Sequence, residues 1–147
     1  MFNSNILLGN IMVNNPSSKY PIKVMVVDDE KDILRIIKRD LETNGNTFKV
    51  DTFQSSELAL RAFESHSGNY YDLVLTDIRM PKMNGFELYR RIKEKNPSMK
   101  IAFITAFEIN KEEFNKVLPS IDVKDFIIKP ISMPDLMRKL KSIVGRS

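Results

Sequence analysis

The chain has 147 residues, 42% of them hydrophobic, and a formal net charge of +4 at pH 7. That length suits one globular domain with a core large enough to fold without disulfides, and it leaves no room for a second folded domain. The sequence contains no cysteine, which excludes disulfides, thiolate zinc sites and thiol nucleophiles. We therefore expect a reducing, cytoplasmic environment.

The first 20 residues are polar and rich in asparagine. Their apolar runs, 6–8 and 11–13, are far too short to span a bilayer, and they lack the basic flank of a signal peptide. Residues 14–18 are turn-prone. We expect residues 1–20 to form a poorly ordered leader, residues 21–147 to form the folded domain, and no segment to span a membrane.

The first predicted elements of the domain are a strand, a helix, a second strand and a second helix. Residues 22–27 are apolar at nearly every position, which is typical of a strand covered on both faces. The helix that follows is predicted to bury Ile33, Ile36, Ile37 and Leu41. Residues 48–53 alternate only partly, as an edge strand does. Ser55 or Ser56 then caps a helix whose predicted inner face carries Leu58, Ala59, Ala62 and Phe63.

The second half of the chain continues the alternation of strands and helices. Apolar runs predict three more strands, at 73–75, 101–104 and 126–128. Helical spacing of apolar residues predicts helices over 85–95, around 114–121 and from 133 to 144. The last of these has the most regular apolar stripe, formed by Met133, Leu136, Met137, Leu140, Ile143 and Val144.

Five strands alternating with five helices predict an α/β fold in which helices cover both faces of a parallel sheet. The functional crevice of such a sheet lies beyond the carboxyl ends of its strands. The polar residues at those ends are Asp28 and Asp29 after the first strand, Asp77 after the third, Thr105 after the fourth and Lys129 after the fifth. We expect these five side chains to gather on one rim.

Three carboxylates on one rim need a cation, because like charges about 4 Å apart repel by about 4 kcal/mol at an effective dielectric of about 20. Lys129 supplies only one positive charge. An all-oxygen site without histidine or cysteine suits Mg²⁺, with water or phosphate oxygens completing its octahedron. Magnesium, acids, a lysine and a hydroxyl together describe a site for phosphoryl transfer. Asp77, at the end of the central strand, is the predicted nucleophile, which would form an aspartyl phosphate.

Four motifs resemble the receiver domain of two-component response regulators. They are VVDDE at 26–30, LTDIRMP at 75–81 followed by Asn84-Gly85, ITA at 104–106 and Lys129-Pro130. Each motif alone is weak, but four in the right order, each placed after a strand, are highly specific. The resemblance covers about residues 21–145, and it predicts a CheY-like receiver domain over residues 21–147. Because only 17 residues follow Pro130, we expect this receiver domain to stand alone, without an output domain.

The resemblance implies a flavodoxin-like, doubly wound sheet of five parallel strands in the order 2-1-3-4-5, flanked by five helices. It also implies that Asp77 accepts a phosphoryl group from a histidine kinase. Asp29, Asp77 and the backbone carbonyl of Arg79 would bind Mg²⁺ directly, and Asp28 would act largely through a bound water.

Three further residues take roles from the same resemblance. Lys129 would contact the phosphoryl group, and Thr105 would move toward it. Phe126 matches the family's aromatic switch position, whose ring turns inward when the threonine shifts. The Lys129-Pro130 bond resembles the family's cis peptide bond, and only X-Pro bonds adopt the cis form at low cost.

The implied partners are a sensor histidine kinase or phosphotransfer protein and an unidentified downstream protein. The signal would leave through protein contacts, by docking or by a phosphorylation-dependent homodimer, and the only catalysis would be phosphorylation and dephosphorylation of the chain's own aspartate. A phosphorelay intermediate and a phosphate-independent binding module remain alternatives. An aspartyl-phosphate hydrolase would want an acid where Arg79 stands.

Nucleic-acid binding is the remaining class that the positive charge permits. From Lys129 to Ser147 the chain carries five bases and one acid, Asp135. No recognition-helix motif or interleaving of aromatic and basic residues accompanies that charge. We therefore interpret these bases as the solvent-facing surface of the last helix, and we do not expect a nucleic-acid partner.

Overall fold

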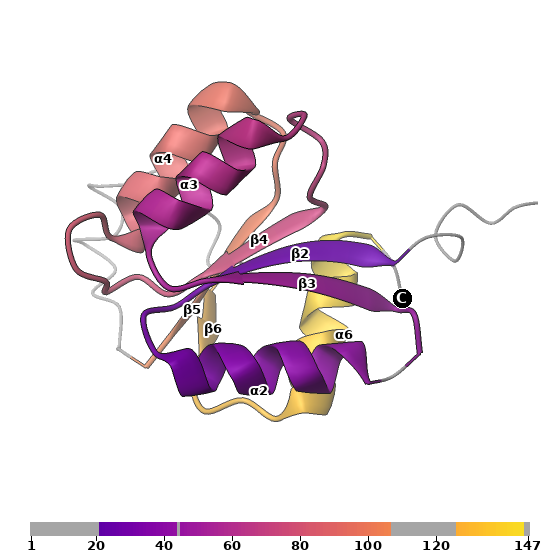
Figure 1. The fold of residues 1–147 in the computed structure, drawn as a ribbon. Coiled ribbons are helices and arrows are strands. Elements are labelled where there is room, and N and C mark those ends of the chain that lie inside the picture. Colours follow the sequence, from indigo (N-terminus) through magenta and orange to yellow (C-terminus); the bar gives the residue numbers. More distant parts are fainter. Residues whose placement is uncertain (1–20, 44, 107–125, 146–147) are drawn as a thin grey trace, which may run out of the picture.

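The computed structural model describes residues 21–43, 45–106 and 126–145 (Figure 1). Its elements in chain order are β2 (Ile22–Val27), α2 (Lys31–Glu42), β3 (Phe48–Phe53), α3 (Ser56–Ser65), β4 (Leu73–Thr76), α4 (Gly85–Lys95), β5 (Ile101–Thr105), β6 (Phe126–Ile128) and α6 (Met133–Ile143). All five strands lie where the sequence pattern predicted them, four from apolar runs and β3 from its partial alternation. The helix predicted around 114–121 and the leader predicted over 1–20 lie outside the described residues.

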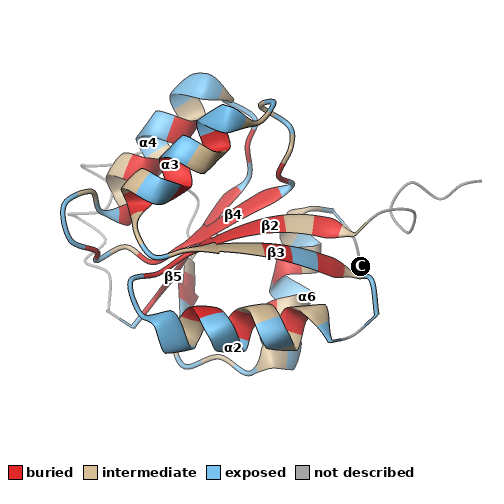
Figure 2. Ribbon diagram, viewed as in Figure 1, coloured by how far each residue is buried: buried red, intermediate tan, exposed pale blue. Residues whose placement is uncertain are grey.

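The five strands form one parallel sheet in the order β3-β2-β4-β5-β6. This is the order 2-1-3-4-5, so the predicted flavodoxin-like topology is confirmed. The partly polar strand β3 lies at the edge of the sheet, as its pattern predicted. The central strands are almost fully buried because neighbouring strands flank them and helices cover both of their faces (Figure 2).

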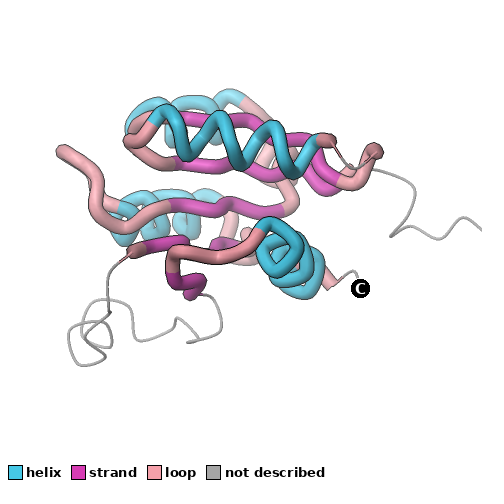
Figure 3. The backbone as a smooth tube through the Cα atoms, turned by 90° about the horizontal axis from the view of Figure 1, so that it is seen from below, coloured by secondary structure: helices cyan, strands magenta, loops and turns pink. Residues whose placement is uncertain are grey.

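Two helices cover each face of the sheet among the described elements. The α2 and α6 helices share one core cluster with alternate strand residues such as Val24 and Val26. The α3 and α4 helices share a second cluster with the strand residues that alternate with these, such as Met25 and Val27. Figure 3 shows the sheet from the side that α2 and α6 cover. This arrangement directs the carboxyl ends of all the strands toward one rim.

Side-chain caps fix where three of the helices begin. Ser55 accepts a hydrogen bond from the Leu58 N–H at the start of α3. Asn84 and Ser132 cap α4 and α6 in the same way. The cap of α4 matters for the site, because it sets the end of the loop that follows β4.

The helices are rotated slightly from the predicted orientation. In α2 the buried residues are Leu34, Ile37 and Leu41, whereas Ile36 is 41% exposed. In α3 Leu58 is 47% exposed, and Leu60 is buried in its place. The predictions for Ile36 and Leu58 were therefore wrong. No helix within the described ranges is long and apolar enough to cross a bilayer.

Candidate functional site

The first two acids of the site follow β2 directly. Asp28 continues the strand, since its N–H donates to the carbonyl of Phe53 on β3 at 3.1 Å. Its side chain is buried, and its Oδ1 accepts the N–H of Glu30 at 2.9 Å, which holds the turn into α2. Asp29 lies between these residues with an exposed side chain. The turn thus separates one buried carboxylate from one that faces solvent.

Asp77 occupies the end of the neighbouring strand β4. Its N–H donates to the carbonyl of Val27 at 2.9 Å, which keeps the ends of β2 and β4 level. Its Oδ1 accepts the N–H of Ile78 at 2.7 Å, and the residue is 8% exposed. The carboxylate is therefore held in one orientation while remaining open to a reactant at the rim.

The lysine reaches the acids from the end of β6, the edge strand on the other side of β4 and β5 from Asp28. Lys129 follows β6, and its N–H donates to the carbonyl of Thr105 at 2.8 Å. Its Nζ lies 2.9 Å from Oδ2 of Asp28 and 3.4 Å from Oδ2 of Asp77. Thr105 itself is fully buried at the end of β5. The Lys129–Pro130 peptide bond is cis, as predicted.

The close approach of these charged groups, together with their burial, shifts the pKa values of Asp77 and Lys129. Burial raises the pKa of Asp77; Lys129 opposes that rise and Asp28 adds to it, and the result lies above the usual value. Burial alone would lower the pKa of Lys129, but its contacts with Asp28 and Asp77 raise it. An added cation beside Asp77 would favour the ionised carboxylate, which is the nucleophilic form.

The donor set of this cluster fits a hard divalent cation. One carboxylate oxygen from each of Asp28, Asp29 and Asp77 lies within 4.8 Å of those of the other two. All three ligand atoms are oxygens, and the single ammonium of Lys129 cannot balance three carboxylates. Oxygen ligands of this kind, with further positions left for water or phosphate oxygens, suit Mg²⁺.

Two other predicted site residues are close in sequence to members of the cluster, and they differ in how far they are buried. Arg79 is in the loop after β4, two residues beyond Asp77, and its side chain is exposed. Phe126, at the start of β6, is half-buried and stacks on Phe103, with ring centroids 5.1 Å apart. The metal-binding role of the Arg79 carbonyl and the switching role of Phe126 stay predictions.

The packing around the site includes two residues to which the sequence analysis gave no role. A Cβ on Gly85 would lie 2.2 Å from the carbonyl oxygen of Asp77, and the Gly85 N–H donates to the carbonyl of Ile78 at 2.8 Å. Only glycine fits there, and its place in the Asn84-Gly85 motif was the available signal. Phe103 is fully buried, and no sequence motif pointed to it. It lies beside Phe126 because the two residues are paired in the register of β5 and β6, which the sequence did not reveal.

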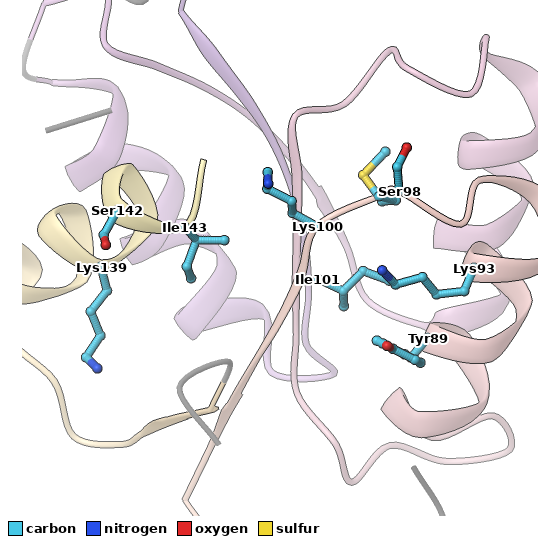
Figure 4. A pocket seen from close by; sticks show the side chains of 9 residues that line it. Tyr89, Lys93, Ser98, Lys100, Ile101, Lys139, Ser142 and Ile143 are labelled. Carbon is cyan, nitrogen blue, oxygen red and sulfur yellow. The ribbon is translucent and has the colours of Figure 1, made fainter. Parts of the chain in front are cut away.

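A pocket of about 480 Å³ lies at the end of the sheet opposite the acidic rim, between α4, the start of β5 and α6 (Figure 4). Among the described residues that line it, the charged ones are Lys93, Lys100 and Lys139, and none is an acid. The described lining therefore supplies none of the carboxylates that a metal or an aspartyl phosphate requires. Those groups are concentrated at the carboxyl ends of the strands.

Comparison with known proteins identifies relatives of this sequence and fold. The family model described as response regulator receiver domain matches residues 24–141. The chain is 32% identical over 126 residues to the alkaline phosphatase synthesis transcriptional regulatory protein PhoP of Bacillus subtilis, covering 85% of this chain and 49% of that protein. The chain thus spans about half the length of this curated relative.

Solved structures give the same result over nearly their whole length. A response regulator receiver domain protein from Clostridium thermocellum has a TM-score of 0.71 and 32% identity, covering 84% of this chain and 94% of that one. The response regulator TrrA from Thermotoga maritima, solved in complex with Mg²⁺ and BeF, has a TM-score of 0.68 and 30% identity, covering 82% and 97%.

Proposed function

Because the chain belongs to the response regulator receiver domain family, we propose that it is a phosphoacceptor of a two-component system. Asp77 takes the phosphoryl group from the phosphohistidine of a sensor histidine kinase or a phosphotransfer protein. The observation that carries this proposal is the cluster of three carboxylates within 4.8 Å, with the Lys129 ammonium 2.9 and 3.4 Å from two of them. We expect the exchange to occur in the cytoplasm.

In the proposed step a carboxylate oxygen of Asp77 attacks phosphorus. The bond between phosphorus and the donor's imidazole nitrogen breaks, the imidazole takes up a proton, and an acyl phosphate forms on Asp77. The Ile78 N–H, 2.7 Å from Oδ1 of Asp77, fixes the carboxylate for this attack. Attack by water on the same phosphorus later returns the free aspartate and inorganic phosphate.

The other rim residues stabilise the negative charge of the phosphoryl group during its transfer. Mg²⁺, when bound, neutralises negative charge on the phosphoryl oxygens, and Asp28, Asp29, Asp77 and the carbonyl of Arg79 are the groups we propose to hold it. Lys129 contacts a phosphoryl oxygen and gives up part of its contact with Asp28. The Thr105 hydroxyl donates a hydrogen bond to the same group.

The switch then changes which proteins the domain contacts. Movement of Thr105 toward the phosphoryl group shifts the carbonyl that accepts the Lys129 N–H, and this movement is passed to β6 and Phe126. A ring without a hydroxyl can contribute only burial and stacking, so Phe126 signals through its packing on Phe103. The receiving surface belongs to a downstream protein or to a second phosphorylated copy.

The test is the intact-protein mass after incubation with Mg²⁺ and acetyl phosphate. We expect one added phosphoryl group on the native chain, and none on Asp77→Asn or without the metal. Asp72→Asn, which removes an exposed acid just before β4, is the matched control and should be phosphorylated normally. An adduct that persists on Asp77→Asn would refute the assignment.

Absence of any adduct, with a second small phosphodonor and beryllium fluoride also failing to bind, would instead favour a phosphate-independent binding module. Where phosphorylation succeeds, incubation with a histidine phosphotransfer domain distinguishes the remaining roles. Return of the phosphoryl group to that histidine indicates a relay intermediate, and its retention on Asp77 indicates a terminal regulator.

A further inference from the structure

Within the part of the chain that the structure describes, the β3 strand forms a long free edge of the sheet. Among the described strands it pairs only with β2, so every second residue of β3 directs its backbone N–H and C=O away from the sheet. The strand has six residues, whereas β6 at the other edge has three. An exposed edge of this kind is a template on which a strand of another chain can pair.

The composition of β3 makes such pairing favourable. Its sequence, Phe-Lys-Val-Asp-Thr-Phe, contains four residues that favour strands and no proline or glycine. The two charges, Lys49 and Asp51, have opposite signs, so an antiparallel copy of β3 would encounter attraction rather than repulsion. Lys49 is the one side chain of β3 of a kind that discourages edge pairing, and in an antiparallel pair centred on Val50 it would face Asp51 of the second copy.

Two side chains of α2 occupy the centre of this edge. The N–H of Val50 donates to Oε2 of Glu42 at 2.8 Å, and Nζ of Lys38 donates to the carbonyl of Val50 at 2.6 Å. Lys38 and Glu42 also bind each other at 3.2 Å. Both outward-facing backbone groups of Val50 are thus satisfied from within the chain, as a neighbouring strand would satisfy them.

The packing of α2 explains why these two residues reach the edge. The helix lies along β3 (Figure 1) and buries Ile37 and Leu41 against the same core as Val50. Lys38 and Glu42 each follow one of these buried residues, one turn apart, so they share the flank of the helix beside the free edge. Both side chains are only partly exposed.

We propose that Lys38 and Glu42 close the free edge of β3 against pairing with β3 of a second copy of this chain. The second copy is the fitting occupant, because identical edges meet about a two-fold axis and each then satisfies the Val50 groups of the other. The pair acts as a built-in competitor for those groups. This role is independent of phosphorylation at Asp77.

The experiment compares the association of variants of the full chain, without Mg²⁺ or phosphodonor. Lys38→Ala/Glu42→Ala should associate as concentration rises, measured by size-exclusion chromatography with light scattering, while the native chain does not show this increase. The matched control is Asp32→Ala/Arg35→Ala, which removes an exposed ion pair from the same helix. The control should behave as the native chain does.

Hydrogen exchange of the Val50 amide identifies the surface involved. In the dilute double variant this amide should exchange several-fold faster than in the native chain, because its acceptor is gone. At concentrations where the variant associates, protection should return, since the N–H then bonds to the second strand. Association in which the Val50 amide stays unprotected would overturn the proposal.

A folded double variant that stays in the native association state at every concentration would overturn the proposal as well, and so would equal association of the control. Lys38→Met guards against a double variant that fails to fold, because it keeps the aliphatic stem and leaves Glu42 on the Val50 N–H. It should associate more weakly than the double variant and more strongly than the native chain. No increase over the native chain would count against the proposal.

Discussion

The Nζ of Lys129 lies 2.9 Å from Oδ2 of Asp28, although 101 residues separate them in the sequence. Lys129 follows β6 and Asp28 follows β2, so the lysine side chain spans the ends of the two strands between them. The ammonium is closer to Asp28 than to the proposed phosphoacceptor. A cation entering the cluster would therefore compete with Lys129 for the Asp28 carboxylate.

Replacing Lys129 should make stability depend on added Mg²⁺. In Lys129→Met the carboxylates of Asp28 and Asp77 lose their cationic partner, and we expect the free energy of unfolding to fall by about 1–3 kcal/mol in metal-free buffer. Magnesium should recover much of this loss. Urea unfolding at pH 7 measures both effects. Lys139→Met, on the exposed surface of α6, is the control, and equal stability of the two variants without metal would contradict the prediction.

Gly85→Ala should distort the proposed phosphoacceptor through its backbone. The new Cβ would meet the carbonyl oxygen of Asp77 at 2.2 Å, so the loop must shift. We expect a loss of about 1–3 kcal/mol in unfolding free energy and slower phosphorylation from acetyl phosphate. Gly68→Ala is a matched control, since its Cβ would lie 3.8 Å from Asn96. An unaltered phosphorylation rate in Gly85→Ala would show that the loop absorbs the methyl group elsewhere.

Two adjacent serines should respond to alanine with opposite signs. Ser55 caps α3 by accepting the Leu58 N–H, so Ser55→Ala should destabilise the fold by about 1 kcal/mol. The buried Ser56 hydroxyl has no hydrogen-bond partner among the described residues, and Ser56→Ala should stabilise the fold by about 0.5–1 kcal/mol. Urea unfolding of both variants provides the comparison. A loss of stability in Ser56→Ala would mean that the hydroxyl is satisfied in solution.

The buried phenol of Tyr71 should make the fold sensitive to alkali. Burial, together with the hydrogen bond to Asp51 at 2.8 Å, raises the pKa of Tyr71 well above its ordinary value of 10.0. Above about pH 10 the unfolded chain releases the phenolic proton, whereas the folded chain retains it. The free energy of unfolding therefore falls as pH rises, by at most about 1.4 kcal/mol per pH unit. Unfolding midpoints from pH 8 upward would show a flatter profile for Tyr71→Phe. An equally steep profile in Tyr71→Phe and the native chain would contradict the prediction.

The strand positions and the rim residues could be predicted from the sequence because both depend on local pattern. A strand covered on both faces must be apolar at nearly every position, which marked β2, β4 and β5 directly. The edge strand β6 has the same kind of apolar run, although only its middle residue, Ile127, is buried. The residue after each buried strand must lie at the carboxyl end of a parallel sheet. This rule alone placed Asp28, Asp77 and Lys129 on one rim.

The rotation of the helices could not be predicted in the same way. Apolar residues in α2 and α3 occupy more positions than one face can bury. Their periodicity therefore did not determine which of these residues face the sheet. Packing against the sheet then buried Leu34 rather than Ile36, and Leu60 rather than Leu58. The choice depends on the shape of the opposing strands, which no local pattern contains.

The fold class, the strand order implied by the family motifs, and the charged groups at the rim all followed from the amino-acid sequence. The contacts between elements became known from the folded chain alone. Lys129 pairs more closely with Asp28 than with Asp77, and away from the rim Lys38 and Glu42 bind the backbone of Val50. Separation in space explains this difference. Periodicity and strand ends are properties of neighbouring residues, whereas these contacts join residues on different elements whose separation is fixed only when both pack on the same sheet.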